Sequence, residues 1–516
     1  MPLPLSDVVA TSRTVASTSS RTAKVDALAA CLSRAADDGP ETVEVVAAHL
    51  AGILPQRRLG VSWRGLRSLP EPAETSSLSV LEVDAAATEL AQISGPGSAA
   101  RRSALVRSLF ERTTAEEQRW LRGLITGETR QGAGDGVMLQ AIAKASGVPD
   151  AAVRRAVMLA GHAGPVARAA LDGGAEALDA LTLEVGRPLR PMLASSAPDV
   201  PAALGTLGGE VLVETKLDGI RLQAHVDHED VRLFTRTLED VTDRLPEIVE
   251  ALAALDVESA VLDGEVIALR EDGRPQPFQV TGARTASSAD PASLRDEVPL
   301  TPFFFDVMHV DGEDLLDHSA TDRWARLALT VPGAWLPARV LTADPDEAQA
   351  FFDDIVRAGH EGVIVKDPSL PYAAGRRGQG WIKVKPRHTL DLVVLAVEWG
   401  SGRRRGWLSN IHLGARDAET GELVMLGKTF KGMTDDMLKW QTERFRELAV
   451  DEPDPDEWVV WLRPEQVVEV AFDGVQRSSR YPGGMALRFA RVLRYRDDKP
   501  VSEIDTVQTV RRLAGW

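Results

Sequence analysis

Lys216 stands inside an otherwise apolar, strand-like segment. Residues 210–226 read EVLVETKLDGIRLQAHV, in which Glu214, Lys216 and Asp218 separate two apolar runs. Alternate side chains of an extended chain share a face, so Glu214 and Lys216 would point the same way. The Asp-Gly pair between two alternating runs equally predicts a β-hairpin with the lysine in water, and these residues alone favour that hairpin. The other charged segments of the chain favour a lysine within a site.

A second apolar run carries two carboxylates. In AVLDGEVIAL, residues 260–269, Asp263 and Glu265 are two positions apart and share one face of the expected strand. A buried, unpaired carboxylate is unfavourable, so these side chains need a cation, a metal ion or hydroxyl donors. For this run alone, a strand that leaves the core at a turn is the slightly better interpretation.

Two further strand-like runs bring more charged groups. EGVIVKD, residues 361–367, begins with Glu361, and WIKVK, residues 381–385, places Lys383 and Lys385 on one face together with Trp381. Two lysines that converge there, with Arg377 just before them, suit a polyphosphate. Four strands with lysines and carboxylates are hard to explain as surface, so the segments together predict a site.

The periodicity of the chain predicts three domains. Apolar residues recur at helical spacing between about residues 21 and 180, which predicts an all-α domain over residues 1–187. Short apolar runs alternate with helical stretches over 188–387, as expected for an α+β domain. Five strand-like runs with one helical insert, around residues 433–448, follow over 388–516 and suit a C-terminal β-barrel of the OB-fold type.

Composition restricts the class of protein. The 516 residues include 44% hydrophobic and 26% charged side chains, as in globular proteins. The single cysteine, Cys31, excludes an intramolecular disulfide and any zinc module built on two or more cysteines. No apolar run is long enough for a membrane span and the N-terminus does not resemble a signal peptide, so we expect no membrane association and a cytoplasmic location, at the nucleoid if the source is bacterial.

The net charge of -17 opposes nucleic-acid binding by the chain as a whole, because phosphate neutralisation requires lysine and arginine. The arginines are nevertheless clustered, between 101 and 130, around 375–387, at 403–405 and between 477 and 496. Each cluster alone is more often a solvated face than a binding site.

Seven motifs in order resemble those of the covalent nucleotidyltransferases, and among these the ATP-dependent DNA ligases. They are KLDGIR (216–221), FTRTLEDVT (234–242), LDGEVIAL (262–269), FFFDVMHVDG (303–312), EGVIVKD (361–367), WIKVK (381–385) and LRFARVLRYRDDK (487–499). The resemblance covers about residues 80–505. It implies a multidomain protein with a helical DNA-binding domain, an adenylation domain of ATP-grasp-like type and a C-terminal OB-fold.

The resemblance also implies the reaction. Lys216 would attack the α-phosphate of ATP, the AMP would pass to the 5′-phosphate of a nick, and the 3′-hydroxyl would then displace AMP. A lysine suits the first transfer because its neutral amine is a good nucleophile. Nicked double-stranded DNA is the expected partner of a monomeric enzyme, and no protein partner is identifiable.

The roles of the other site residues are likewise carried over from the family. Glu214 would contact adenine, Phe305 would stack on it, Arg236 would bind the ribose, Asp218 and Arg221 would position the ribose and phosphates, Glu265 and Glu361 would bind the sugar or Mg²⁺, Arg377, Lys383 and Lys385 would neutralise phosphate charge, and Arg488 and Arg491 would orient the pyrophosphate.

Other interpretations of the same motifs remain. NAD-dependent ligases share the lysine but carry a four-cysteine zinc module that this chain cannot build, so ATP is the expected donor. RNA ligases and capping-type nucleotidyltransferases share the core without a role for the helical domain. A catalytically inactive nick-binding scaffold would keep the fold, but should have lost some of Lys216, Glu265 and Glu361.

Overall fold

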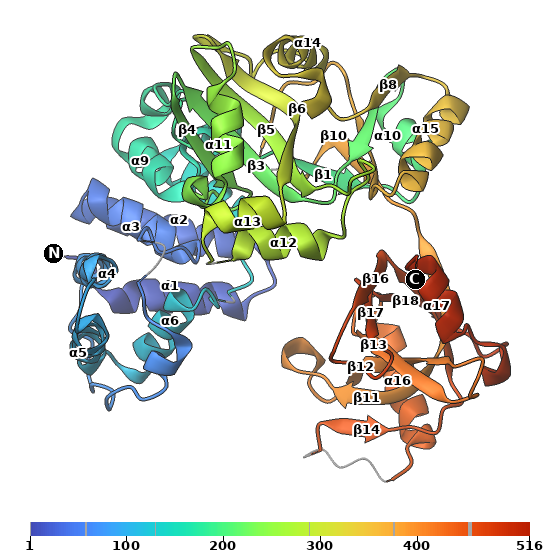
Figure 1. Ribbon diagram of the computed structural model, residues 1–516. Helices are drawn as coiled ribbons and strands as arrows, with labels where there is room; N and C mark the ends of the chain where they lie inside the picture. The colour runs from blue at the N-terminus through green and yellow to red at the C-terminus, as the bar shows by residue number, and fades with distance from the viewer. Residues whose placement is uncertain are drawn as a thin grey trace. The chain divides into compact units, whose positions relative to one another are not determined.

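The computed structural model describes residues 2–56, 59–129, 131–287, 289–374, 377–451 and 457–515, without the side chains of residues 64 and 377–379. The chain divides into two compact units, Met1–Lys383 and Val384–Trp516 (Figure 1). Each unit is described by itself. No helix among the described residues is long and apolar enough to cross a membrane.

The first unit begins with helices, as the periodicity predicts. The described helices are α1 (Leu5–Ser17), α2 (Arg21–Asp38), α3 (Pro40–Leu50), α4 (Val80–Gln92), α5 (Ser98–Glu111), α6 (Ala115–Ile125), α7 (Asp135–Ser146), α8 (Asp150–Ala160) and α9 (Ala163–Asp179), with a 3₁₀ turn at Trp63–Leu66. Ser79 and Thr114 start α4 and α6 with capping boxes completed by Glu82 and Glu117. Helices α1 to α3 and α7 to α9 share one core, α4 to α6 form most of a second core, and α1 contributes to both through Val8 and Val9.

The rest of the first unit is built on two sheets. One has the strand order β1 (Leu193–Ser196), β10 (Arg377–Val384), β9 (Gly362–Lys366), β2 (Val211–Lys216), β8 (Arg339–Thr342). The other has the order β4 (Asp230–Thr235), β3 (Ile220–Asp227), β5 (Ser259–Ala268), β6 (Leu300–Val310), β7 (Glu313–Asp314). The α+β architecture expected of this region is therefore present.

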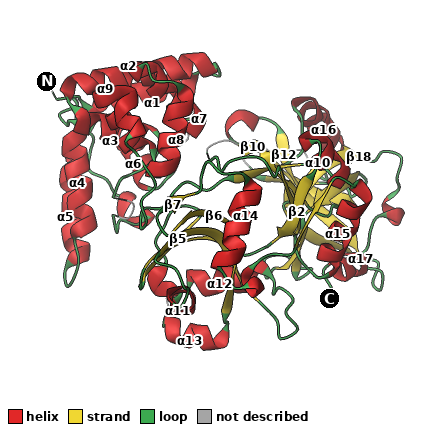
Figure 2. Ribbon diagram, turned by 90° about the horizontal axis from the view of Figure 1, so that it is seen from above, coloured by secondary structure: helices red, strands yellow, loops and turns green. Residues whose placement is uncertain are grey.

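Helices cover both sheets. They are α10 (Val200–Leu207), α11 (Pro246–Ala253), α12 (Phe278–Ala286), α13 (Pro291–Glu297), α14 (Ala320–Thr330) and α15 (Pro345–Arg357), with 3₁₀ turns at Thr242–Arg244 and Gly333–Trp335. Helix α14 packs on β6, α11 on β4 and β6, and α15 on β2, β8 and β9 (Figure 2).

The strands β2 and β3 follow each other in the chain but belong to different sheets. β2 pairs with β8 and β9, whereas β3 pairs with β4 and β5. The hairpin interpretation of residues 210–226 is therefore wrong. Lys216 ends a strand of one sheet, and the chain then crosses to the other sheet at Asp218 and Gly219.

The second unit contains the expected antiparallel strands. They are β11 (His388–Trp399), β12 (Leu408–Arg416), β13 (Leu423–Thr429), β14 (Val459–Trp461), β15 (Val467–Phe472), β16 (Gly474–Arg477), β17 (Met485–Arg488) and β18 (Arg491–Tyr495). Helix α16 (Asp435–Leu448) confirms the predicted insert, and α17 (Val507–Leu513) lies near the C-terminus, with 3₁₀ turns at Gly402–Arg404 and Val501–Glu503.

The predicted closed barrel is not confirmed. The described strands form an open sheet in the order β13, β12, β11, β15, β18, with β14 also on β11, and a separate hairpin of β16 and β17. Two runs with a strand-like pattern, VVEVAFDGV (467–475) and LRFARVLRYR (487–496), are each divided into two strands. One ends at Phe472 and restarts at Gly474, and the other breaks at Phe489, whose φ of 55° lies in the left-handed region that strands exclude.

Candidate active site

Lys216 meets a carboxylate at the end of its strand. Its Nζ forms an ion pair with Glu361 and donates a hydrogen bond to the Leu217 carbonyl at 3.2 Å. Glu361 directly precedes β9, and β9 pairs with β2 so that Gly362 lies opposite Lys216. The Lys216 and Glu361 side chains are 19% and 16% exposed. The amine is thus partly shielded from water but still open to a ligand.

Glu265 provides a second carboxylate beside this lysine. Its Oε1 accepts a hydrogen bond of 2.6 Å from the backbone N–H of Gly219. A Cβ at Gly219 would lie 2.2 Å from the Val266 carbonyl oxygen, so only glycine allows the chain to pass this close to β5. Burial raises the pKa of Glu265, and the charge of Lys216 and the Gly219 N–H oppose that shift.

Arg221 of β3 and Asp263 of β5 form a bidentate ion pair. Arg221 Nε lies 2.7 Å from Asp263 Oδ1, and Nη2 lies 2.5 Å from Oδ2. Asp263 is fully buried, and Tyr372 also donates its hydroxyl hydrogen bond to Oδ2, at 2.7 Å. Of the two carboxylates of the AVLDGEVIAL run, Asp263 is buried and Glu265 is partly buried, and both have partners, as their burial requires.

An aromatic pair stands beside these charges. The Phe305 and Trp381 rings are 6.0 Å apart and nearly perpendicular. Arg221 Cζ lies 4.7 Å from the centre of the Phe305 ring, and Lys366 Nζ lies 4.5 Å from that of Trp381. Lys366 also holds Glu214 in a buried ion pair of 2.6 Å.

The predicted residues do not all lie together. Lys216, Glu361 and Glu265 form one group, and Glu214, Arg221 and Phe305 lie around Lys366 and Asp263. Asp218 is partly buried in the crossing between the sheets, Arg236 is exposed in the turn after β4, and Lys383 is partly buried in β10.

The remaining predicted cations lie elsewhere. Lys385, Arg488 and Arg491 belong to the second unit, in which Lys385 forms an ion pair of 3.2 Å with Asp473. The Arg377 backbone begins β10, and its side chain lies outside the described part of the structure.

Sequence reasoning missed the roles of Lys366 and Tyr372. Lys366 ends an apolar strand as Lys216 does, and that pattern could have drawn attention to it. Tyr372 lies between two motifs and carried no local signal, since its partners are Asp263 and Met192, both more than a hundred residues earlier.

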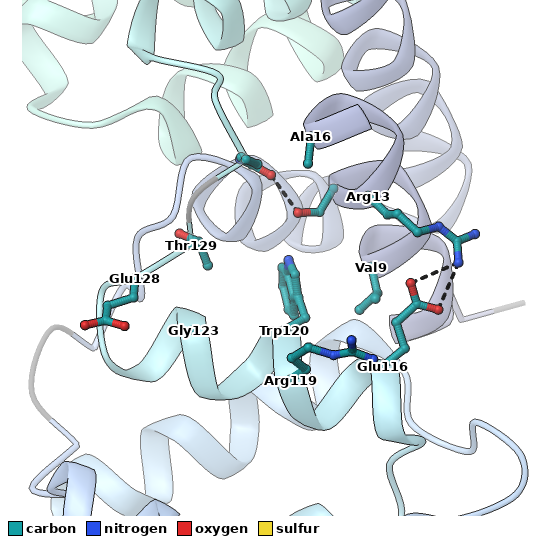
Figure 3. Close-up of a pocket in the computed structure, with 11 residues that line it drawn as sticks. Val9, Arg13, Ala16, Glu116, Arg119, Trp120, Gly123, Glu128 and Thr129 are labelled. Carbon is teal, nitrogen blue, oxygen red and sulfur yellow. Dashed lines mark hydrogen bonds and ion pairs between the residues drawn. The ribbon is translucent and has the colours of Figure 1, made fainter. Parts of the chain in front are cut away.

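The helical domain has a pocket of its own. It has a volume of about 320 Å³ and is lined by residues of α1 and α6 together with Glu128, Thr129 and Gln131 (Figure 3). Arg13 and Glu116 form an ion pair of 3.0 Å at one side, Arg119 is exposed on α6, and Trp120 projects between the two helices. This pocket is separate from the Lys216 group.

Comparisons with known proteins agree with this arrangement. Family models described as ATP dependent DNA ligase domain, DNA ligase N terminus and ATP dependent DNA ligase C terminal region match residues 191–385, 64–143 and 404–499. A probable DNA ligase of Nocardioides sp. is 60% identical over 99% of both chains, and the DNA ligase B of Mycobacterium tuberculosis is 56% identical over 99% of both. The solved structure titled Pmar-Lig_PreS3 shares the fold, with a TM-score of 0.61 and 18% identity over 95% of this chain and 99% of that one.

The fold and the matching family models define the class of the protein as a nucleotidyl-transferring enzyme. The chain belongs to the ATP-dependent DNA ligase family, which the motifs predicted. ATP is accordingly its nucleotide donor and DNA its substrate, and neither the RNA-directed enzymes nor an inactive scaffold is favoured.

Proposed function

We propose that this ligase seals nicks in duplex DNA through an AMP bound covalently to Lys216. The observation that carries the proposal is the position of the Lys216 amine, held at the end of β2 by Glu361 and beside the partly buried Glu265. Glu361 gives the amine a proton acceptor already in contact with it.

The first transfer follows from these contacts. The Lys216 nitrogen forms a bond to the α-phosphorus of ATP while the bond from that phosphorus to the bridging oxygen breaks, and pyrophosphate leaves. Before this attack Glu361, ion-paired with the ammonium group, takes up one of its protons, because only the neutral amine has a lone pair for the new bond. AMP then passes to the 5′-phosphate of the nick, and the 3′-hydroxyl displaces it.

The nucleotide would lie against the aromatic pair. Phe305 would stack on adenine, and Glu214, fixed by Lys366, would contact its edge. Asp218, Arg221 and Arg236 would bind the ribose and phosphates. The ordered pairs of Glu214 and Arg221 support these roles because they fix both side chains before the nucleotide arrives.

The residues beside Lys216 fit magnesium carried in by the nucleotide. The described residues contain no group of three or more potential metal-binding side chains. Mg²⁺ is commonly held by one or two carboxylates plus substrate phosphates, and Glu265 and Glu361 could be those carboxylates. Bound there, Mg²⁺ would neutralise charge on the phosphates.

The remaining cations would act on the phosphates. Arg377, Lys383 and Lys385 would neutralise charge in the transition state, and Arg488 and Arg491 would orient pyrophosphate. That role requires the second unit, which we propose to be an OB-fold domain (388–516), to close on the adenylation domain (188–387).

The helical domain (1–187) would hold the duplex, with the enzyme acting as a monomer. Arg13 and Arg119 lie on neighbouring helices at the rim of the pocket in Figure 3, where exposed guanidinium groups can bind phosphate.

A nick that already carries AMP on its 5′-phosphate allows the sealing step to be measured without adenylation of the enzyme. Lys216→Ala should fail to seal a 5′-phosphorylated nick with ATP and Mg²⁺, yet seal the pre-adenylated nick, because that substrate bypasses the lysine. Lys144→Ala, which removes an exposed lysine of the helical domain, is the matched control and should seal both. Sealing of the 5′-phosphorylated nick by Lys216→Ala would contradict the proposal.

A further inference from the structure

Tyr372 belongs to the segment between β9 and β10, outside every motif quoted above. The residue is 2% exposed. Its hydroxyl donates to Asp263 Oδ2 at 2.7 Å and accepts from the Met192 N–H at 2.9 Å. The hydroxyl therefore acts as a donor to a carboxylate and as an acceptor from the backbone.

These contacts close a ring of four hydrogen bonds. Arg221 Nη2 donates both to Asp263 Oδ2, at 2.5 Å, and to the Met192 carbonyl, at 3.2 Å. Tyr372 joins Asp263 to the Met192 N–H and so completes the ring. Four segments that are distant in the chain meet here, and each polar group of the ring has a partner. Buried polar networks specify one geometry when all members are satisfied.

The ring determines where the Arg221 guanidinium lies. Its Cζ is 4.7 Å from the centre of the Phe305 ring and 5.8 Å from that of Trp381. Tyr372 also contacts Trp381 edge to face, with ring centres 6.2 Å apart. Burial and the negative charge of Asp263 raise the pKa of Tyr372 well above its usual range, so its hydroxyl keeps the proton that it donates.

We propose that Tyr372 is a positioning residue of the nucleotide site, whose hydroxyl orients the Asp263 carboxylate and through it the Arg221 guanidinium beside Phe305. The proposal rests on the proposed role of Lys216 and Arg221 in accepting AMP from ATP. Tyr372 itself touches neither the lysine nor the nucleotide in this account.

Adenylation of the enzyme by ATP labelled at the α-phosphate tests this proposal. The rate is measured as a function of ATP concentration for the wild type and for Tyr372→Phe. Phenylalanine keeps the buried ring and removes the hydroxyl, which leaves the Met192 N–H without its acceptor. We expect the adenylation rate to fall on the order of tenfold, as for the loss of one hydrogen bond to a charged group, while the protein stays folded and its urea midpoint falls only modestly because the Met192 N–H loses its acceptor.

Tyr495→Phe is the matched control. The Tyr495 hydroxyl also donates a hydrogen bond of 2.7 Å to a side-chain oxygen, that of Gln441, within the second unit. We expect its adenylation rate to equal that of the wild type.

Arg221→Lys distinguishes positioning from general stabilisation. If Tyr372 acts through Arg221, adding Tyr372→Phe to Arg221→Lys should lower the adenylation rate little further. Lysine cannot form the bidentate pair with Asp263 that the ring of hydrogen bonds maintains. Wild-type adenylation in Tyr372→Phe, fold-changes that multiply in the double variant, or loss of the folded state in Tyr372→Phe would each overturn the proposal. Absence of label on the wild type would instead contradict the proposed function.

Discussion

The adenylation site and the helical domain use charged pairs in opposite ways. Near the site the pairs are buried: Arg323 and Asp306 are 1% and 5% exposed, and Lys366 and Glu214 are 5% and 3%. In the helical domain Arg13 and Glu116 are 66% and 44% exposed. A buried pair cannot exchange its partner for water and so fixes a position. An exposed pair stabilises little and leaves its arginine available to a phosphate.

The largest effect should come from breaking the most buried pair. Arg323→Met removes both hydrogen bonds to Asp306, at 2.7 and 3.0 Å, and leaves a buried carboxylate without its cation. We expect the free energy of unfolding in urea to fall by about 3–5 kcal/mol. A loss below about 1 kcal/mol would mean that this pair behaves like an exposed one.

A buried histidine tests the core of the helical domain. His49 is 1% exposed, and burial lowers its pKa to about 4. The unfolded chain binds a proton near pH 6.5 and the folded chain does not, so stability is present above that pH and is lost as the pH falls toward 4. The loss should reach about 3 kcal/mol at pH 4.

His49→Leu has no group to titrate at this position and serves as the comparison. Its helical domain should lose less stability over the same pH interval, measured by amide hydrogen exchange in α3. Parallel losses in the two proteins would mean that His49 is protonated in the folded state.

The exposed arginines should be visible in the salt dependence of DNA binding. If Arg13 and Arg119 each contact a phosphate, Arg13→Gln and Arg119→Gln should each reduce the slope of log affinity against log salt by about 1. Fluorescence anisotropy on nicked duplex at several salt concentrations measures this slope. Unchanged slopes would show that the pocket rim in Figure 3 faces solvent only.

The smallest effect should come from an exposed pair within one helix. Arg107 and Glu111 are 73% and 51% exposed and lie 2.9 Å apart on α5. Arg107→Met should change the free energy of unfolding by less than about 0.5 kcal/mol. A loss of several kcal/mol would remove the distinction between the two regions.

The sequence predicted the strands better than the contacts that their side chains make. Most strands of the adenylation domain, including β2 and β9, lie within one or two residues of the predicted runs, because alternation and apolar length are local properties. The acidic pair Asp263 and Glu265 was recognised for the same reason. Their partners, Arg221, Tyr372 and the Gly219 N–H, depend on sheet pairing and could not be read from the pattern.

The same reasoning explains the two clearest differences between the local sequence pattern and the structure. The Asp-Gly signal at 218–219 predicts a hairpin because the pattern does not show that β2 and β3 pair with other strands. Barrel closure depends on which edge strands meet, which no single run encodes, and the described pairings of the second unit leave the sheet open. The roles of the site residues came from family resemblance and remain proposals.

Peptide mass spectrometry after incubation with ATP and Mg²⁺ tests the central claim most directly. The account predicts an adenylate adduct on Lys216 in the wild type, and no adduct in Lys216→Ala or when NAD replaces ATP. An adduct on another residue, or its persistence in Lys216→Ala, would contradict the assignment of Lys216 as the nucleophile.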